Sequence, residues 1–276
     1  MISEEFKDIL FEKEENGIVT VTLNRPERKN ALSALTLLEL WYAVDIAERD
    51  KDIKIMILTG SEKANAFCSG GYFSTKDLRK EIPPELHDEI TIYLRDMASK
   101  KLCLKFWDFS KPVIAAMNGL AVGGGFTLPV VCADLIYASE NAWFGLYFIK
   151  RAVMVDFATS YLLPFLIGFQ KAKELFYFGD KITAHEAEEM GLINKVLPKN
   201  ELMPYAREQA LRLVPPKGPS VSIKLMKKTM HAYFRDIIEK QLDLENKKWV
   251  KTLASKDFAE SLKALEEKRE PVFMGK

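Results

Sequence analysis

The chain has 276 residues, of which 48% are hydrophobic, and its 40 basic and 39 acidic residues leave a net charge of +1. This length suits one large domain, or one domain with a helical appendage. The balanced charge argues against the basic surface of nucleic-acid-binding proteins, and no apolar run reaches the roughly 20 residues that span a bilayer. We therefore expect neither a nucleic-acid nor a membrane partner.

Cysteine usage and the chain ends favour a cytoplasmic location. Cys68, Cys103 and Cys132 are odd in number and widely spaced, which argues against a disulfide framework. The first ten residues, MISEEFKDIL, lack the apolar core of an export signal. The last four, FMGK, do not match a peroxisomal address.

The first part of the chain alternates between strand and helix signals. Strands are predicted over residues 18–23, 53–59, 112–117 and 135–138, because these segments are short and apolar. Helices are predicted over residues 33–49, where Ser33 would cap the first turn, and over residues 84–107. This alternation predicts an α/β core over residues 1–199, built from repeated strand and helix units.

Helical patterns alone fill the rest of the chain. Residues 201–214, 220–234 and 237–254 carry apolar residues at helical spacing, and a segment rich in proline and glycine separates the first two. Amphipathic helices need an apolar surface to bury against, either the core or a neighbouring subunit. Residues 200–276 are therefore predicted to form a helical C-terminal region.

Two loops of small residues are candidates for binding negative charge through their backbone. Gly123, Gly124 and Gly125 follow an apolar strand and precede a segment that would open a helix, whose free N–H groups bind anions. A second loop, residues 66–72, could present another N–H, and two such donors would form an oxyanion hole. A tight turn with close backbone packing explains the triple glycine equally well.

Asp156 is the single carboxylate in a nearly apolar stretch, residues 145–168. It could act as an acid/base group, or it could cap a helix over residues 157–167, and one side chain can do both. His87, His185 and His231 are isolated from one another and show no metal-ligand spacing, so no metal site is predicted.

The order of short motifs along nearly the whole chain resembles the enoyl-CoA hydratase/isomerase, or crotonase, superfamily. These motifs include NRP at 24–26, NAL at 30–32, AFCSGG at 66–71, KPVIAAMNG at 111–119, the triple glycine, ADLIYASENA at 133–142 and ITA at 182–184. The resemblance implies a crotonase-like spiral of ββα units. It also implies assembly as a homotrimer or a dimer of trimers, with residues 200–276 as the trimerisation region.

The resemblance also implies positions for the site. The family stabilises a thioester enolate with two backbone N–H groups, which fall here on Gly71 and Gly124. Coenzyme A enters as part of the acyl-CoA substrate, so no separate cofactor is expected. The remaining substrate-binding positions are implied to be Arg28, Asn30, Ala31, Ser69, Gly70, Tyr72, Phe148 and Lys268.

The chain departs from the family at the two glutamates that hydratases use. The first position falls on Thr127, or on Leu128 if the alignment shifts by one residue, and the second falls on Phe148. Addition of water to a double bond needs a base for the water and an acid for the α-carbon. Because none of these side chains transfers a proton, a conventional hydratase is disfavoured.

Asp156 matches the acidic residue of Δ3,Δ2-enoyl-CoA isomerases of the peroxisomal type, one acid of the dienoyl-CoA isomerases, and the nucleophile of 4-chlorobenzoyl-CoA dehalogenase. The dehalogenase also needs a histidine and a tryptophan, and those positions hold Lys100 and Phe148 here. The resemblance therefore predicts a double-bond isomerase with Asp156 as acid/base. An apolar wall that includes Phe148 and Phe157 would raise its pKa toward neutrality.

Two alternatives stay open. The first is another crotonase reaction, such as hydration, dehalogenation or hydrolysis of an unusual acyl-CoA. The second is a catalytically lapsed protein that binds acyl-CoA and keeps the fold.

Overall fold

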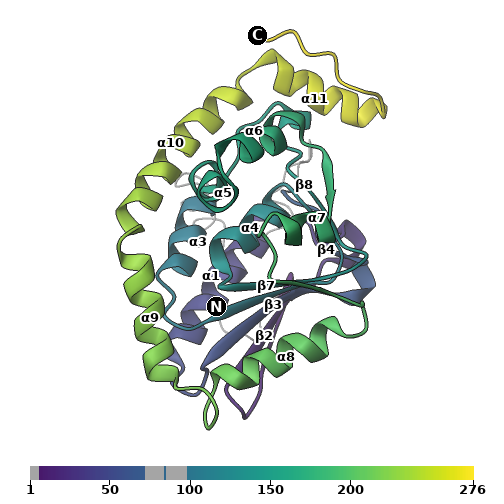
Figure 1. Ribbon diagram of the computed structural model, residues 1–276. Coiled ribbons are helices and arrows are strands. Elements are labelled where there is room, and N and C mark those ends of the chain that lie inside the picture. Colours follow the sequence, from purple (N-terminus) through teal and green to yellow (C-terminus); the bar gives the residue numbers. More distant parts are fainter. Residues whose placement is uncertain (1–5, 72–83, 85–97) are drawn as a thin grey trace.

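The computed structural model describes residues 6–71, 84 and 98–276, which form two sheets and the helices around them (Figure 1). Within these residues the larger sheet has six strands, in the spatial order β1 (Ile9–Lys13), β2 (Ile18–Leu23), β3 (Ile55–Gly60), β5 (Val113–Met117), β7 (Leu135–Ser139) and β10 (Lys195–Leu197). The smaller sheet has four, in the order β4 (Ala66–Cys68), β6 (Leu120–Val122), β8 (Trp143–Gly145) and β9 (Lys181–Thr183). Neighbouring strands are parallel except for β1 with β2 and β8 with β9.

Helices connect the parallel strands and then fill the C-terminal part of the chain. The α-helices are α1 (Ala34–Arg49), α3 (Ala98–Trp107), α4 (Gly124–Cys132), α5 (Thr159–Ile167), α6 (Phe169–Phe178), α7 (Ala184–Glu189), α8 (Leu202–Leu213), α9 (Ser220–Ala232), α10 (Arg235–Leu253) and α11 (Lys256–Glu267). Short 3-10 helices are η2 (Pro26–Arg28), η3 (Glu62–Ala64) and η6 (Ile149–Arg151). Within the described ranges, no helix has both the length and the apolar character needed to cross a bilayer.

Helices cover both faces of the larger sheet (Figure 1), because its central strands are apolar at successive positions. Successive side chains of a strand point to opposite faces. Met56 and Leu58 of β3 belong to the main core with α1, α3 and α4, whereas Ile55 and Ile57 belong to a second core under α8. A sheet buried on both faces is typical of parallel α/β architectures, which agrees with the predicted fold class.

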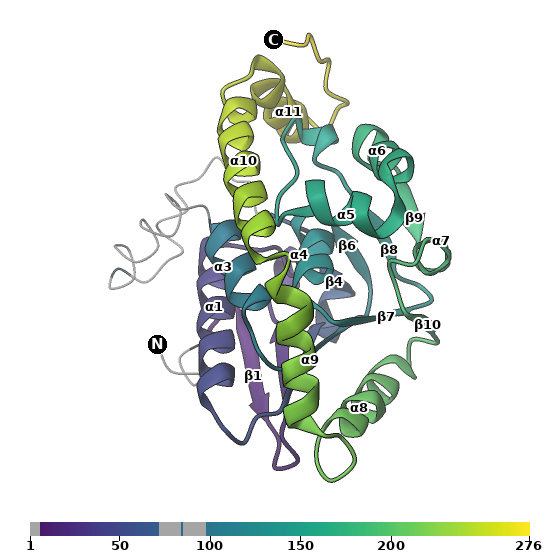
Figure 2. The same ribbon diagram turned by 60° about the vertical axis from the view of Figure 1, so that its left-hand side comes forward.

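The C-terminal helices run along one side of the molecule, with α9 and α10 end to end and α11 at the end where the chain finishes (Figures 1 and 2). Ile238 and Leu242 of α10 are fully buried in the main core. Lys227 of α9 donates to the carboxylate of Asp134 at 2.7 Å. This region therefore docks on the core of its own chain. Its role in trimer assembly and the boundary at residue 199 stay predictions.

Elements with strong local signals agree with the sequence analysis. Ser33 caps α1, since its hydroxyl accepts the Thr36 N–H at 3.0 Å and the Thr36 hydroxyl accepts the Ser33 N–H at 3.1 Å. Strand β3 begins later than predicted because its pairing starts where β2 starts, with Ile18 beside Ile55. The predicted helix over residues 84–107 lies partly outside the described residues, and α3 is its described part.

Candidate active site

A cavity of about 1160 Å³ lies between the two glycine loops, the segment that carries Asp156, and helices α10 and α11. The predicted site residues that line it are Arg28, Ala31, Ser69, Gly70, Gly71, Gly124, Phe148, Asp156 and Lys268. Tyr72 and His87 lie outside the described residues. The fold thus brings together segments that are more than 200 residues apart in the sequence.

Among the predicted site residues that the structure describes, Asn30 is the one that does not line the cavity. It is buried, with 1% of its surface exposed, and it has a positive φ of 55°. Its side-chain oxygen accepts the Arg25 N–H at 2.9 Å, and its side-chain nitrogen donates to the Ala66 carbonyl at 3.0 Å. Asn30 therefore stabilises the loop that precedes α1, because its side chain forms hydrogen bonds to backbone groups.

The two glycine loops touch each other, because side chains are absent where their backbones meet. A Cβ atom on Gly70, whose φ is 91°, would lie 2.4 Å from the Val122 carbonyl oxygen. A Cβ atom on Gly125 would lie 2.3 Å from the Cys68 carbonyl oxygen. Both distances are shorter than any real contact of a Cβ atom, so only glycine allows this approach. The close-packing interpretation of the triple glycine is therefore confirmed for Gly125, and the same constraint applies to Gly70.

Gly71 and Gly124 line the cavity from these two loops. Gly124 is the first residue of α4, so its N–H has no acceptor within the helix. The Cβ position of Gly124 lies 3.5 Å from Oδ2 of Asp156 and 3.7 Å from the Phe157 ring. The start of α4, whose first N–H groups have no acceptor within the helix, thus lies beside the Asp156 carboxylate at the cavity, and a helix start of this kind suits the binding of negative charge.

The carboxylate of Asp156 is surrounded by protein and meets the cavity. Burial raises its pKa to about 7, although a hydrogen bond from the Thr127 hydroxyl opposes this rise. Phe148, Val153 and Phe157 line the cavity with it. This agrees with the expectation that an apolar wall would bring the acid close to neutral pH.

Asp156 does not cap the helix that follows it, so that interpretation is wrong. Helix α5 begins at Thr159, and its N-cap residue Ala158 makes no capping side-chain bond. The Asp156 backbone carbonyl accepts the Thr159 N–H at 3.1 Å, while its side chain bonds elsewhere. The chain turns sharply between Asp156 and the helix, which leaves the carboxylate free to face the cavity.

Thr127 makes a contact with Asp156 that the sequence does not predict. Its hydroxyl donates to Oδ1 of Asp156 at 2.6 Å, and the residue is fully buried in α4. Thr127 occupies a position where the resemblance to the crotonase superfamily implies a glutamate in hydratases. In this chain it instead forms a hydrogen bond to Asp156, which comes from another segment. A polar residue inside an apolar helix is the only local signal of this role.

Glu245 of α10 is a second unpredicted residue at the cavity. Its carboxylate accepts the N–H of Ala158 at 2.8 Å and the N–H of Ser160 at 3.0 Å. Burial raises its pKa to about 7, and only 2% of its surface is exposed. Because it lies in a charge-rich amphipathic helix, the sequence alone favours a solvated position.

The remaining walls combine apolar and cationic groups. Trp249 and Leu253 of α10 line the cavity together with Leu265 of α11. Arg151 of η6 and Lys268, which follows α11, supply positive charge at the same cavity. Such a surface can bind a molecule that has an apolar part and an anionic part.

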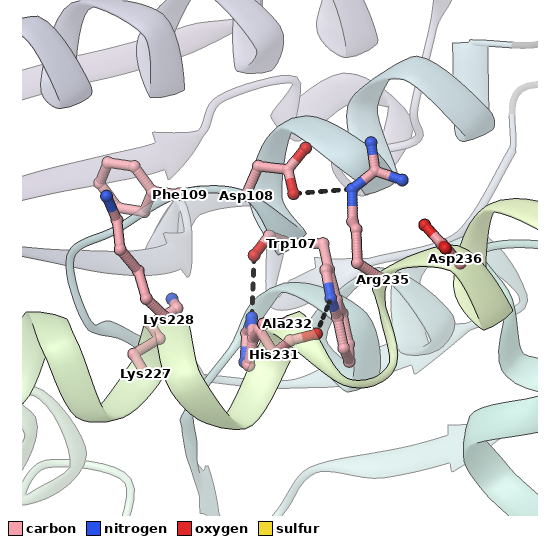
Figure 3. A pocket seen from close by; sticks show the side chains of 9 residues that line it. All are labelled: Trp107, Asp108, Phe109, Lys227, Lys228, His231, Ala232, Arg235 and Asp236. Carbon is pink, nitrogen blue, oxygen red and sulfur yellow. Dashed lines mark hydrogen bonds and ion pairs between the residues drawn. The ribbon is translucent and has the colours of Figure 1, made fainter.

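A second hollow, of about 390 Å³, lies where α3 ends and where α9 passes into α10 (Figure 3). Arg235 donates to the Asp108 carboxylate there at 2.7 Å. The His231 ring stacks on Trp107 with centroids 4.3 Å apart, and its Nδ1 donates to the Trp107 carbonyl at 2.8 Å. These pairs tie the C-terminal helices to the core. None of the residues lining this hollow also lines the larger cavity, and we assign it no binding role.

Known proteins match this chain over nearly its whole length. The profile of the family described as enoyl-CoA hydratase/isomerase matches residues 13–276. A short-chain-enoyl-CoA hydratase of Clostridium acetobutylicum is 32% identical over 96% of this chain and 97% of its own. The 1,2-epoxyphenylacetyl-CoA isomerase of Escherichia coli is 30% identical over 95% of this chain and 97% of its own. A crystal structure of an enoyl-CoA hydratase/isomerase from Pseudoalteromonas atlantica has a TM-score of 0.83 at 26% identity, covering 97% of this chain and 100% of that one.

Proposed function

Because the chain belongs to the enoyl-CoA hydratase/isomerase family, we propose that it shifts the double bond of an enoyl-CoA thioester. Membership makes the protein an enzyme that acts on acyl-CoA thioesters, and the structural match confirms the predicted crotonase-like fold. Relatives are named both as hydratases and as isomerases. The choice between these reactions rests on the geometry around Asp156.

The observation that carries the proposal is one acid, Asp156, with a pKa of about 7, whose Oδ2 lies 3.5 Å from the Cβ position of Gly124 at the start of α4. In the proposed reaction the ionised Asp156 takes a proton from C2 of a 3-enoyl-CoA. The N–H groups of Gly71 and Gly124 hold the enolate oxygen, and Asp156 returns the proton to C4. A pKa close to the working pH suits a group that both takes and gives a proton.

Hydration is the less suitable reaction for this site. It needs a second group that activates water, and the two hydratase positions hold Thr127 and Phe148. Within the described residues, Glu245 and Glu270 are the other carboxylates that line the cavity. Both oxygens of Glu245 accept backbone N–H groups, and Glu270 is exposed at the cavity rim. Neither supplies a buried base opposite Asp156.

Coenzyme A enters this scheme as part of the substrate. We propose that Arg28, Ala31, Ser69, Gly70 and Lys268 hold its nucleotide and pantetheine parts, because these residues line the cavity. The acyl group would then lie against the apolar wall that includes Phe148. Charged side chains at a phosphate and apolar side chains at an acyl chain match the two parts of the molecule.

The test is to incubate the protein with a 3-enoyl-CoA and to follow the appearance of 2-enoyl-CoA. Asp156→Asn should reduce this conversion by a factor of about 10³ or more, since the variant has no acid/base group. Asp52→Asn is the matched control, because the Asp52 side chain is 84% exposed and outside the cavity. Conversion that survives Asp156→Asn would contradict the mechanism. A 3-hydroxyacyl-CoA product would indicate hydration, and binding without turnover would indicate a lapsed enzyme.

A further inference from the structure

The turn that follows Asp156 has an unusual backbone conformation. Phe157 and Ala158 have φ values of 54° and 58°, so two consecutive residues other than glycine lie in the left-handed region. Residues with a Cβ atom avoid this region and persist there only when their surroundings hold them. The direction of the Asp156 side chain depends on this turn, so the groups that hold it matter for the site.

Glu245 of α10 stabilises this turn by hydrogen bonds to its backbone. One carboxylate oxygen accepts the N–H of Ala158 at 2.8 Å, and the other accepts the N–H of Ser160 at 3.0 Å. The hydroxyl of Ser160 donates to the same carboxylate and accepts a bond from Gln241, one helical turn earlier on α10, at 2.7 Å. Hydrogen bonds to an ionised acceptor are stronger than neutral ones. Glu245 thus provides, from a distant helix, the cap that α5 lacks.

The C-terminal helices also hold the chain before Asp156. The Met154 N–H donates to the Thr252 hydroxyl of α10 at 3.3 Å, and the Ser261 hydroxyl of α11 donates to the Arg151 carbonyl at 3.1 Å. Residues of the C-terminal region therefore form hydrogen bonds to the chain both before and after Asp156. Glu245 contributes the contacts nearest to the acid.

We propose that Glu245 is a positioning residue, which fixes the turn that aims Asp156 at the substrate. This inference rests on the proposed role of Asp156. Glu245 is not a second acid/base group, because its oxygens are occupied by two N–H groups and a hydroxyl, and the side chain is buried. It acts on the reaction only through the position and the charge environment of Asp156.

The ionisation of Glu245 is coupled to that of Asp156. Burial is the main cause of the raised pKa of Glu245, and the negative charge of Asp156 adds to it. Cys68 of β4 and Cys103 of α3 also interact with Asp156, but burial raises their pKa values, that of Cys68 to about 12, so both thiols stay neutral. The cations that line the cavity are Arg28, Lys150, Arg151, Lys268 and Arg269, and its other carboxylate, Glu270, is exposed.

The first test is Glu245→Gln in the full-length protein, with kcat, KM and the pH profile measured on 3-enoyl-CoA. We expect kcat to fall by roughly 10- to 100-fold while KM changes less than about threefold, because a small displacement of a catalytic group affects mainly the chemical step. The low-pH limb of the kcat/KM profile should move to lower pH, since a negative charge that interacts with Asp156 is removed. A purely structural role would lower the yield of folded protein and leave both readouts unchanged.

Glu239→Gln is the matched control, because Glu239 lies on the same helix, faces Arg235 and Lys100, and is outside the cavity. It should behave like the unchanged protein. If Glu245→Gln does not fold, Ser160→Ala replaces it, since this change removes the hydroxyl contacts with the carboxylate and with Gln241 and keeps both N–H bonds to Glu245. A several-fold loss in kcat at constant KM is then expected. A folded variant of either kind with unchanged kcat and pH profile would overturn the proposal.

A second test does not depend on the reaction. The melting temperatures of Asp156→Asn, Glu245→Gln and the double variant are compared at pH 8.5 and at pH 5. Both acids are ionised at the higher pH and protonated at the lower, so the changes should be non-additive at pH 8.5 and additive at pH 5. Additive changes at both values would overturn the coupling of the two residues. If the unchanged protein does not isomerise 3-enoyl-CoA, the proposed function fails, and this comparison still decides whether Glu245 acts on Asp156.

Discussion

At the scale of single residues, two opposing effects determine the pKa of Asp156. Burial favours its protonated form, and the hydrogen bond from Thr127 favours its ionised form. Burial is the stronger effect and brings the pKa to about 7, compared with about 3.9 for an unperturbed aspartate. The folded state therefore places an ordinary side chain close to the pH at which it can exchange protons in both directions.

This balance predicts the pH dependence of the reaction. Asp156 must be ionised to take the first proton, so kcat/KM should rise with pH and level off above its folded pKa of about 7. The measurement is a pH–rate profile on 3-enoyl-CoA, with circular dichroism to show that the protein stays folded. A rise in kcat/KM that is complete below pH 5 would contradict the raised pKa of Asp156.

Thr127→Val tests the opposing contact with little change in shape. Loss of the hydroxyl removes a bond that favours the ionised carboxylate, so the pKa of Asp156 should rise further and the limb should move to higher pH. We expect kcat/KM at pH 7 to fall by roughly 3- to 10-fold, which corresponds to about one pKa unit or less. Thr127→Ser keeps a hydroxyl and should retain most of the activity. A limb that moves to lower pH would show that the bond has the opposite effect.

The sequence indicates the residues of the site better than the contacts between them. Asp156 and the cavity-lining glycines can be found because each belongs to a local motif. Thr127 and Glu245 cannot, because their importance comes from bonds to Asp156 and to the turn after it, across separate segments. A charge-rich helix gives no sign that one of its glutamates is buried.

At the scale of elements, α10 has two kinds of buried contact. Ile238 and Leu242 pack in the main core, and Glu245 reaches the turn at the active site. Predictions were most successful for β2 and α1, whose apolar pattern and cap are local. The strands of the smaller sheet have three residues each, and they owe their existence to pairing with distant partners. No local pattern of that length distinguishes a strand from a loop.

The packing of α10 predicts a contrast between two leucines on this helix. Leu242→Ala should lower the free energy of unfolding by about 2–5 kcal/mol, because the side chain is fully buried and its loss leaves a cavity. Leu244→Ala should change it by less than about 0.5 kcal/mol, because Leu244 is 47% exposed. Urea denaturation of both variants is the measurement. Equal midpoints would contradict the docking of α10 on the core.

At the scale of the whole molecule, the active-site cavity requires three distant parts of the chain. The loops before α1 and after β4, the region from α4 to α5, and the C-terminal helices each supply part of its wall. The order of motifs predicts the fold, because the motifs occur in family order along the chain. The cover that α10 and α11 provide over the site comes from tertiary packing, and the helix α11 has no counterpart in the sequence prediction.

A single acid in such a cavity should carry the same hydrogen from one carbon to the other. The direct measurement uses 3-enoyl-CoA deuterated at C2, converted in ordinary water and analysed by mass spectrometry or NMR at early reaction times. The account predicts 2-enoyl-CoA in which a substantial fraction of molecules has one deuterium transferred to C4. A product in which the hydrogen gained at C4 always comes from the solvent would contradict proton transfer by Asp156 alone.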